Sequence, residues 1–297
     1  MSNPFDTSHK PVIGQSERLE PDIKVVTAPN AGPMTFTGTR TYLLGAGSGV
    51  AVIDPGPDSE DHLQAILKAV GKQRTIEAIL VTHRHVDHTG LVPMLREISD
   101  APVYGFAADD DRFIAGEGGE GIDRSFSANI TVEDGETISG DGWSVEVVHT
   151  PGHLADHMAL ASGNRLFSGD HVMGWATTLI SPPSGDLTEF MASLDKLLAR
   201  DEVTFYPGHG APVTDPKRLI RHIRDHRLKR EAEIIAELEQ GPASPNDLTR
   251  SIYCHVAQEL HPAAKRNVMA HLIALEKAGR VSSVGESTEN AMFSLVG

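Results

Sequence analysis

The sequence contains one cysteine, Cys254, among its 297 residues. A single thiol excludes an internal disulfide framework and is typical of proteins from a reducing compartment. No metal-binding cysteine spacing surrounds it, so Cys254 is predicted to be a small buried apolar side chain.

Long apolar runs are also missing. No stretch approaches the roughly 18 consecutive apolar residues that a membrane helix needs, so no membrane contact is expected. Residues 1–22 lack the basic and apolar segments of a secretory signal peptide. Together with the cysteine content, these absences predict a cytoplasmic protein.

Basic residues are scarce in the first part of the chain. Residues 1–214 carry 30 acidic and 14 basic residues, whereas residues 215–297 carry 11 and 12. An acidic main body repels phosphate backbones, which lowers the expectation of a nuclease. Bound divalent cations would offset part of this charge.

Short β-branched segments alternate with amphipathic helical segments over residues 1–214. This pattern predicts an α/β domain, and hairpin signals such as Gly163-Asn164 favour two packed sheets with helices outside. Asp186 is expected to cap a helix that follows it. Residues 107–129 are rich in Gly and Asp and predict a loop.

Residues 215–297 have a different texture and are predicted to form a second domain. About two dozen residues with helical periodicity are followed by a Pro-containing break, where Asn246 or Asp247 can cap the next helix. Two more helical segments and two short strands come after it. Three helices and a small hairpin of this kind predict a winged-helix module.

The segment LVTHRHVDHTG, residues 80–90, places three histidines and an aspartate on one bend directly after an apolar strand. Four other apolar strands also end in a candidate ligand. If the strands are neighbours, these groups converge on one rim. Imidazole and carboxylate suit zinc, and also iron or manganese, and seven donors suit two ions sharing a carboxylate. The candidates are His83, His85, Asp87, His88, His153, Asp170 and His209, with Asp54 at the remaining strand end.

The motif THRHVDHTG, followed in order by TPGH, SGD and PGHG, resembles the metallo-β-lactamase superfamily in the form typical of glyoxalase II and its relatives. The resemblance covers residues from about 39 to 213. Residues beyond it resemble the winged-helix domain of the β-lactamase-like protein 2 and endoribonuclease-like branch. This resemblance implies a four-layer αββα sandwich.

The resemblance also implies a role for each candidate ligand. His83, His85 and His153 would bind one metal, and Asp87, His88 and His209 the other. Asp170 would bridge the two ions, and Asp54 would orient ligands. Two such ions lower the pKa of a bridging water to near ~7, which provides hydroxide to attack a carbonyl or phosphoryl centre. The catalytic set predicted here is Asp87, Asp54 and His171.

Several residues near the motifs leave alternatives open. His171 stands where glyoxalase II has threonine, and it is either a proton donor or a packed imidazole. Asp156 and His157 either support the ligands or lie on a hairpin surface. Residues 172–186 are expected to line or cover the pocket. No glutathione-binding region is evident, which argues against glutathione thioesters as the substrate.

Two C-terminal helical segments bear on partners. Residues 217–230 hold seven basic residues, which form either a solvated face or a contact for an anion or RNA. The segment AAKRNVMAHL takes the place of a recognition helix but carries few basic residues for DNA. A homodimer contact or a pocket wall is therefore expected of it.

Three functions remain in order of preference. The first is a dinuclear metallo-hydrolase, with zinc preferred over manganese or iron, acting on a small-molecule ester, thioester or lactone. The second is a ribonuclease or phosphodiesterase on single-stranded RNA, which the acidic main domain disfavours. The third is a winged-helix regulator whose metal domain only senses.

Overall fold

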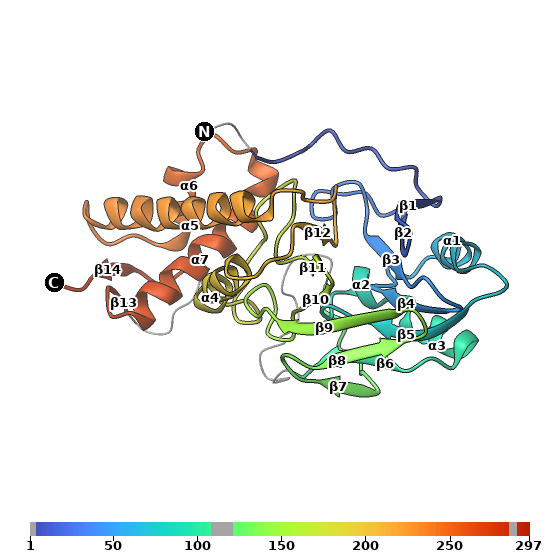
Figure 1. Cartoon of the computed structure of the whole chain (residues 1–297). Helices are drawn as coiled ribbons and strands as arrows, with labels where there is room; N and C mark the ends of the chain where they lie inside the picture. Colours follow the sequence, from blue (N-terminus) through green and yellow to red (C-terminus); the bar gives the residue numbers. More distant parts are fainter. Residues whose placement is uncertain (1–3, 108–120, 285–289) are drawn as a thin grey trace.

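The computed structural model describes residues 4–107, 121–284 and 290–297. Within these residues the chain forms two β-sheets packed face to face, with helices outside and a mainly helical unit at one end (Figure 1). The expected αββα sandwich is therefore present.

The first sheet has seven strands, and neighbours in the chain are neighbours in the sheet. Strands β1 to β4 pair antiparallel, while β4 to β7 pair parallel. The helices α1 (Glu60–Val70) and α3 (Val92–Ser99) follow β4 and β5, with the short α2 (Val86–Thr89) before α3. The sequence analysis missed β1 and β2. The strands are β1 (Ser16–Glu20), β2 (Ile23–Thr27), β3 (Arg40–Leu44), β4 (Gly49–Ile53), β5 (Thr75–Leu80), β6 (Val103–Phe106) and β7 (Ile130–Val132).

The second sheet has five strands in the order β12-β11-β10-β9-β8. The predicted hairpin at Gly163-Asn164 joins β10 to β11, and β11 pairs parallel with β12. Residues 130–138, expected to be strand, contribute β7 to the first sheet and β8 to the second. The strands are β8 (Thr137–Gly140), β9 (Trp143–His149), β10 (Met158–Ser162), β11 (Arg165–Gly169) and β12 (Thr204–Pro207).

Three apolar cores hold the layers together. Tyr42 of the first sheet meets Phe167 and Tyr206 of the second between the sheets. A second core lies between the first sheet and helices α1 and α3. The third lies under α4 (Leu187–Leu198) and the first half of α5 (Pro216–Leu238). Fully burying each large apolar side chain contributes about 1.5–3 kcal/mol, so these cores fix the strands and their ends.

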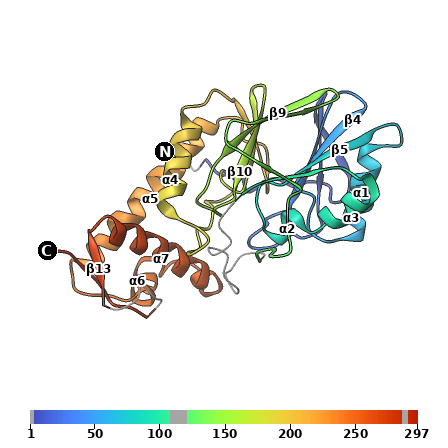
Figure 2. The ribbon, with the colours of Figure 1, turned by 90° about the horizontal axis from the view of Figure 1, so that it is seen from below.

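Helix α5 begins where the second domain was predicted to begin. Ile220 and Ile223, in its first half, pack in the core beneath α4, whereas Ile234 and Leu238 pack in the core of the C-terminal unit. That unit also contains α6 (Pro245–Ile252), the short helix η2 (Gln258–Leu260), α7 (His261–Lys277), β13 (Val281–Ser283) and β14 (Phe293–Leu295). Figure 2 shows this unit beside the sandwich, at the end where α4 and α5 lie.

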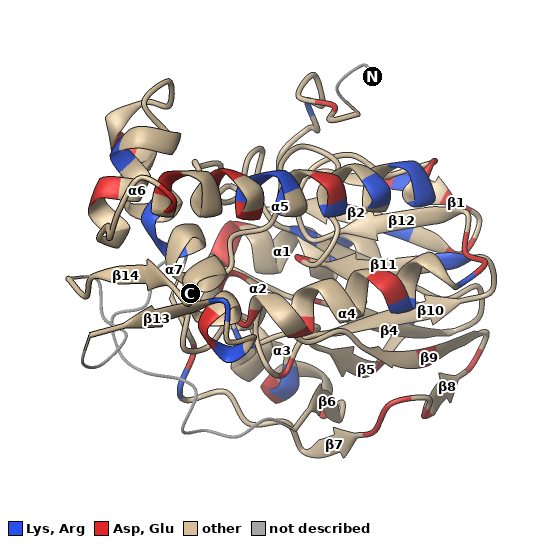
Figure 3. Ribbon diagram, turned by 90° about the vertical axis from the view of Figure 1, so that its left-hand side faces the viewer, with Lys and Arg blue, Asp and Glu red and all other residues tan. Residues whose placement is uncertain are grey.

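Basic and acidic residues alternate along the exposed side of α5 (Figure 3). Arg224 pairs with Asp195 at 3.2 Å, and Arg230 pairs with Glu233 at 2.7 Å. These exposed pairs fit the solvated-face interpretation of residues 217–230. Arg227 is the exception, because its side chain is buried.

Two local predictions were wrong. The cap of α6 is Ser244, whose hydroxyl accepts a hydrogen bond from the backbone N–H of Asp247, and Asp247 completes a capping box from inside the helix. Cys254 is exposed, because it follows the end of α6 at a turn that buries its neighbour Tyr253 more deeply.

Most of the loop predicted at residues 107–129 lies outside the described residues. In the part of the chain that the structure describes, no helix is both long and apolar enough to span a membrane.

Candidate metal centre

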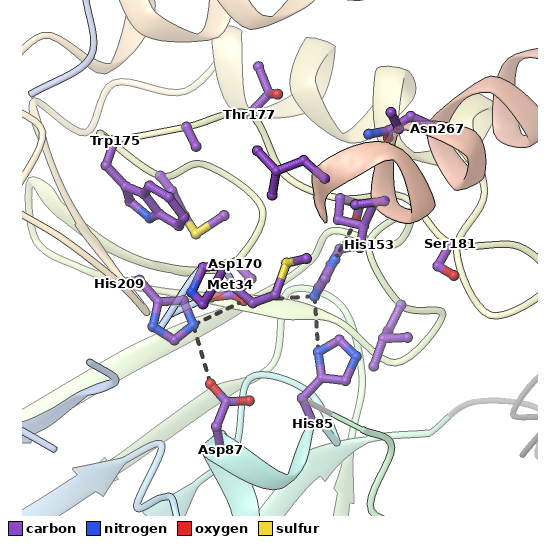
Figure 4. A pocket seen from close by; sticks show the side chains of 18 of the residues that line it. Met34, His85, Asp87, His153, Asp170, Trp175, Thr177, Ser181, His209 and Asn267 are labelled. Carbon is purple, nitrogen blue, oxygen red and sulfur yellow. Dashed lines mark hydrogen bonds and ion pairs between the residues drawn. The ribbon is translucent and has the colours of Figure 1, made fainter. Parts of the chain in front are cut away.

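The candidate ligands lie at the ends of strands from both sheets. The bend between β5 and α2 carries His83 to His88, and Asp54 follows β4 in the same sheet. His153, Asp170 and His209 follow β9, β11 and β12 of the second sheet. Because the sheets face each other, these strand ends meet at one rim, and side chains from both sheets turn toward one another there (Figure 4).

The seven ligand candidates form two adjacent groups. Within each group, one donor atom from every residue lies within 4.8 Å of the others, and all seven side chains are buried. The sequence analysis grouped them in the same way apart from Asp170, which it placed between the ions. The first group is His83, His85, His153 and Asp170, and the second is Asp87, His88 and His209.

Imidazole nitrogens converge in the first group. The Nδ1 atom of His85 lies 3.0 Å from His83 Nε2 and 3.1 Å from His153 Nε2. Burial, reinforced by the neighbouring His153, lowers the pKa of His85 to about 3. Burial likewise lowers the pKa of His83 well below its usual value. The rings are therefore neutral at pH 7 and present lone pairs, which is the form that binds a metal ion.

Carboxylates and imidazoles face each other in the second group. Asp87 Oδ2 lies 3.3 Å from His209 Nε2 and 3.4 Å from His88 Nε2. Burial alone would lower the pKa of His209, but Asp170 and Asp87 outweigh it and raise that pKa to about 9. His88 Nε2 has no hydrogen-bond partner among the described residues, although it is buried. A cation among these atoms would satisfy both the carboxylates and the imidazoles.

Asp170 touches both groups. Its Oδ2 atom lies 3.8 Å from His153 Nε2 and 3.3 Å from His209 Nε2, and its Oδ1 atom lies 3.5 Å from His88 Nε2. This is the position that a bridging carboxylate requires. The donor types, their burial and the unpartnered atoms fit two divalent cations.

Asp54 supports the ligands from behind. Its carboxylate accepts hydrogen bonds from Thr82 N and Thr82 Oγ1, each at 2.7 Å, and lies 3.0 Å from His88 Nδ1. These contacts hold the start of the histidine bend and direct Nε2 of His88 toward the other ligands. Asp54 has a φ of 52°, a left-handed conformation that aspartate and asparagine tolerate better than most residues.

Asp156 and His157, for which two interpretations were open, are both buried and both support the centre. Arg84 Nε donates to Asp156 Oδ2 at 2.9 Å, which ties the histidine bend to the second sheet. His157 Nε2 accepts a hydrogen bond from the backbone N–H of Asp170 at 3.1 Å. Its Nδ1 atom lies 2.8 Å from the hydroxyl of Thr150.

Sequence reasoning missed two further supporting groups. Thr39 donates from its hydroxyl to Asp87 Oδ2 at 2.9 Å, and Asn30 Nδ2 donates to that hydroxyl. No local motif marks Thr39, because it lies 48 positions from its partner. The carbonyl oxygen of Leu179 lies 2.9 Å from His153 Nδ1 and orients that ring. A backbone acceptor of this kind leaves no signal in side-chain identity.

His171 lies behind the centre and does not line the cavity. Its ring is fully buried and packs against Phe190, with ring centroids 4.3 Å apart. Neither ring nitrogen has a hydrogen-bond partner among the described residues. Burial lowers its pKa to about 3. The structure thus favours the packed-imidazole alternative for His171, because its apolar surroundings keep it away from the reacting atoms.

A cavity of about 290 Å³ opens above the ligands. His85, Asp87, His153, Asp170 and His209 form its floor. Seven residues of the 172–186 segment line it, as predicted: Met173, Trp175, Ala176, Thr177, Leu179, Ser181 and Ser184.

Comparison with known proteins identifies two regions. Residues 34–209 match the model of the metallo-beta-lactamase superfamily, and residues 244–289 match the beta-lactamase associated winged helix domain. A beta-lactamase-like protein 2 homolog from Drosophila melanogaster is 34% identical over 286 residues, which is 93% of this chain and 94% of the relative.

Two further similarities extend this result. An atrochrysone carboxyl ACP thioesterase from Aspergillus fumigatus is 33% identical over 238 residues, covering 77% of this chain and 69% of the relative. A beta-lactamase domain protein from Burkholderia ambifaria has the same fold, with a TM-score of 0.81 and 20% identity over 97% of this chain and 96% of that one. The chain therefore belongs to the metallo-beta-lactamase superfamily and is a metallo-hydrolase with a C-terminal winged-helix domain.

Proposed function

We propose that this protein is a dinuclear zinc hydrolase whose substrates are small-molecule thioesters. The observation that carries the proposal is that two groups of buried ligands, joined by Asp170, form the floor of a single cavity. Relatives named as ACP thioesterases support the choice of thioester among the carbonyl substrates considered. Imidazole and carboxylate donors are those of catalytic zinc sites, although manganese and iron also accept them.

When bound, the two ions would supply a water of lowered pKa and polarisation of the substrate carbonyl. His83, His85 and His153 would hold one ion, Asp87, His88 and His209 the other, and Asp170 both. Thr39 donates its hydroxyl proton to Asp87, which keeps that carboxylate in place. The walls of the cavity limit the access of bulk water to the floor.

The leaving group also favours a thioester. A thiol has a pKa of ~8.5, so a thiolate departs near neutral pH without full protonation in the transition state. An amide nitrogen requires a proton donor instead. The one candidate donor that the sequence suggested, His171, lies outside the cavity.

The RNA alternative finds less support in the cavity. No Lys or Arg is among its lining residues within the described part of the chain, and apolar side chains dominate its walls. A groove for single-stranded RNA would be expected to carry basic residues along the backbone path and exposed aromatic platforms. The regulator alternative is also weakened, because the first turns of α7 line this cavity.

Asp87→Ala tests the proposed function. Purified wild type and variant, each restored with zinc, manganese or iron, are assayed on a thioester, a lactone, a β-lactam and a single-stranded RNA. We expect thioester turnover to be the fastest and to fall by at least about 100-fold in the variant, because a ligand is lost. Faster RNA cleavage by wild type would overturn the choice of substrate, and unchanged turnover in the variant would overturn the metal mechanism.

A further inference from the structure

The C-terminal domain supplies one wall of the cavity above the metal ligands. The residues that face the cavity come from the end of α6, the segment after it and the first turns of α7. They are Tyr253, Val256, Leu260, Ala263, Ala264 and Asn267. All but Asn267 present mainly carbon to the cavity, and two of them are alanines, whose small side chains leave space beside α7.

The opposite wall comes from the sandwich and is also apolar. Met34, Met173, Trp175 and Leu179 belong to it. The Trp175 indole is stacked on Phe36, with ring centroids 5.0 Å apart and an interplanar angle of 8°. Trp175 is therefore held as a fixed flat surface on this wall.

Polarity thus changes along the depth of the cavity. The floor holds imidazoles and carboxylates, whereas the walls are largely hydrocarbon up to the mouth, where Leu260 is 42% exposed. A ligand that matches this gradient has one polar reacting end and an extended apolar body. Ordinary polar metabolites would leave the walls unmatched.

We propose that the wall formed by α7 and the segment before it is an acyl-binding subsite, which selects thioesters with an apolar acyl chain. This inference rests on the proposed function. The thioester carbonyl would lie at the metal floor, and the acyl chain would lie between Trp175 and the first turns of α7. Ala264 would determine the chain length accepted, because it is a buried small residue on the wall.

The direct test measures kcat/KM for a series of N-acetylcysteamine thioesters with acetyl, butanoyl, hexanoyl and octanoyl groups. These substrates share one leaving group, so differences report on the acyl chain. We expect kcat/KM to rise by about fourfold for each methylene that the walls cover. Ala264→Leu should lower the octanoyl-to-acetyl ratio of kcat/KM at least about tenfold. Ala257→Leu, which adds the same side chain at an exposed neighbouring position, is the matched control and should keep the wild-type ratio.

The outcomes separate the subsite from the proposed function. If wild type hydrolyses none of the thioesters, the proposed function fails. If it hydrolyses all with equal kcat/KM, or if Ala264→Leu keeps the wild-type ratio, the acyl subsite fails while the function stands. Should Ala264→Leu not fold by circular dichroism, Leu260→Ser at the exposed rim replaces it. That variant is expected to lower the same ratio about fivefold, and an unchanged ratio would again overturn the subsite.

Discussion

Arg227 of α5 donates from Nη1 to Oδ1 of Asn267 in α7 across 3.1 Å. The same oxygen accepts the backbone N–H of Ile180 at 3.3 Å, and Nη2 of Arg227 donates to the carbonyl of Thr178. Leu179, between these two anchored residues, orients the metal ligand His153 through its carbonyl. Two helices of the C-terminal domain therefore hold the segment that positions a ligand in the other domain.

Removing this anchor should weaken metal binding. In Arg227→Met the guanidinium is lost while most of the apolar stem remains, so the 178–180 segment is freed from α5. We expect a roughly tenfold weaker affinity for zinc, the lower end of the effect of groups that orient ligands. Competition with a chromophoric chelator measures it.

Arg224→Met is the matched control for this prediction. Arg224 lies one turn earlier on α5 and also reaches the sandwich, but it pairs with Asp195 of α4. Its loss should leave zinc affinity unchanged. Equal zinc affinities for wild type and Arg227→Met would show that the anchor has no part in holding His153.

Asp54→Asn should also reduce metal affinity, by about 10-fold to 100-fold. The amide cannot offer Thr82 and His88 the two charged acceptor oxygens that Asp54 supplies. Asparagine tolerates the left-handed backbone, so the fold should survive. Metal content after dialysis against a weak chelator is the measurement. Asp100→Asn is the control, because Asp100 is also left-handed, with a φ of 55°, but is exposed at the end of α3. A full metal complement in Asp54→Asn would contradict the role assigned to Asp54.

Removing the metals should destabilise the fold. Seven buried ligands from both sheets lose their common partner when a chelator strips the ions. At a free zinc concentration of about 1,000 times Kd, binding contributes about 4 kcal/mol, which corresponds to about 8 °C in Tm for a chain of this size. Differential scanning calorimetry with zinc and with a chelator tests this. Equal Tm values would mean that the ligand groups bind no ion.

Acid should destabilise the C-terminal domain through His271. Burial, followed by the charges of Arg227, Arg230 and His226 on α5, lowers the pKa of His271 to about 3. The folded state therefore binds fewer protons than the unfolded chain, whose histidine pKa is about 6.5. The resulting stability is present above pH ~6.5 and is lost as the pH falls toward ~3, with about 2 kcal/mol lost at pH 5.

Urea unfolding at pH 7.5 and pH 5 measures this dependence. His271→Leu should lose less stability than wild type between the two pH values, by about 2 kcal/mol. Comparison with wild type cancels the contribution of the metal ligands, which both proteins share. His255→Leu, at an exposed position of the same domain, should behave as wild type. If His271→Leu is as acid-sensitive as wild type, the buried ring is not the cause.

Local patterns were sufficient for much of the fold. The strands β3, β4 and β5 are short apolar runs bounded by turn residues, and the hairpin at Gly163-Asn164 carries its own turn signal. The strand β1 was missed because its exposed SERLE residues have no apolar alternation, and it is held by pairing with β2. The cap of α6 was misplaced because several residues near Ser244 could each accept the helix N–H groups.

The sequence by itself determined the chemistry of the centre. A histidine or aspartate after each of several apolar strands can converge only at a strand-end rim, and this argument needs no knowledge of distant contacts. Thr39, His157 and Leu179 could not be assigned in the same way, because each acts through a partner that only the packed sheets bring near.

Tertiary structure alone decided what surrounds that chemistry. It placed His171 in the packing beneath Phe190, exposed Cys254 and brought Ala264 of the second domain above the metal ligands. The physical reason is range. Ligand spacing is encoded within a few residues of each strand end, whereas the cavity walls depend on how α5 fixes one domain against the other.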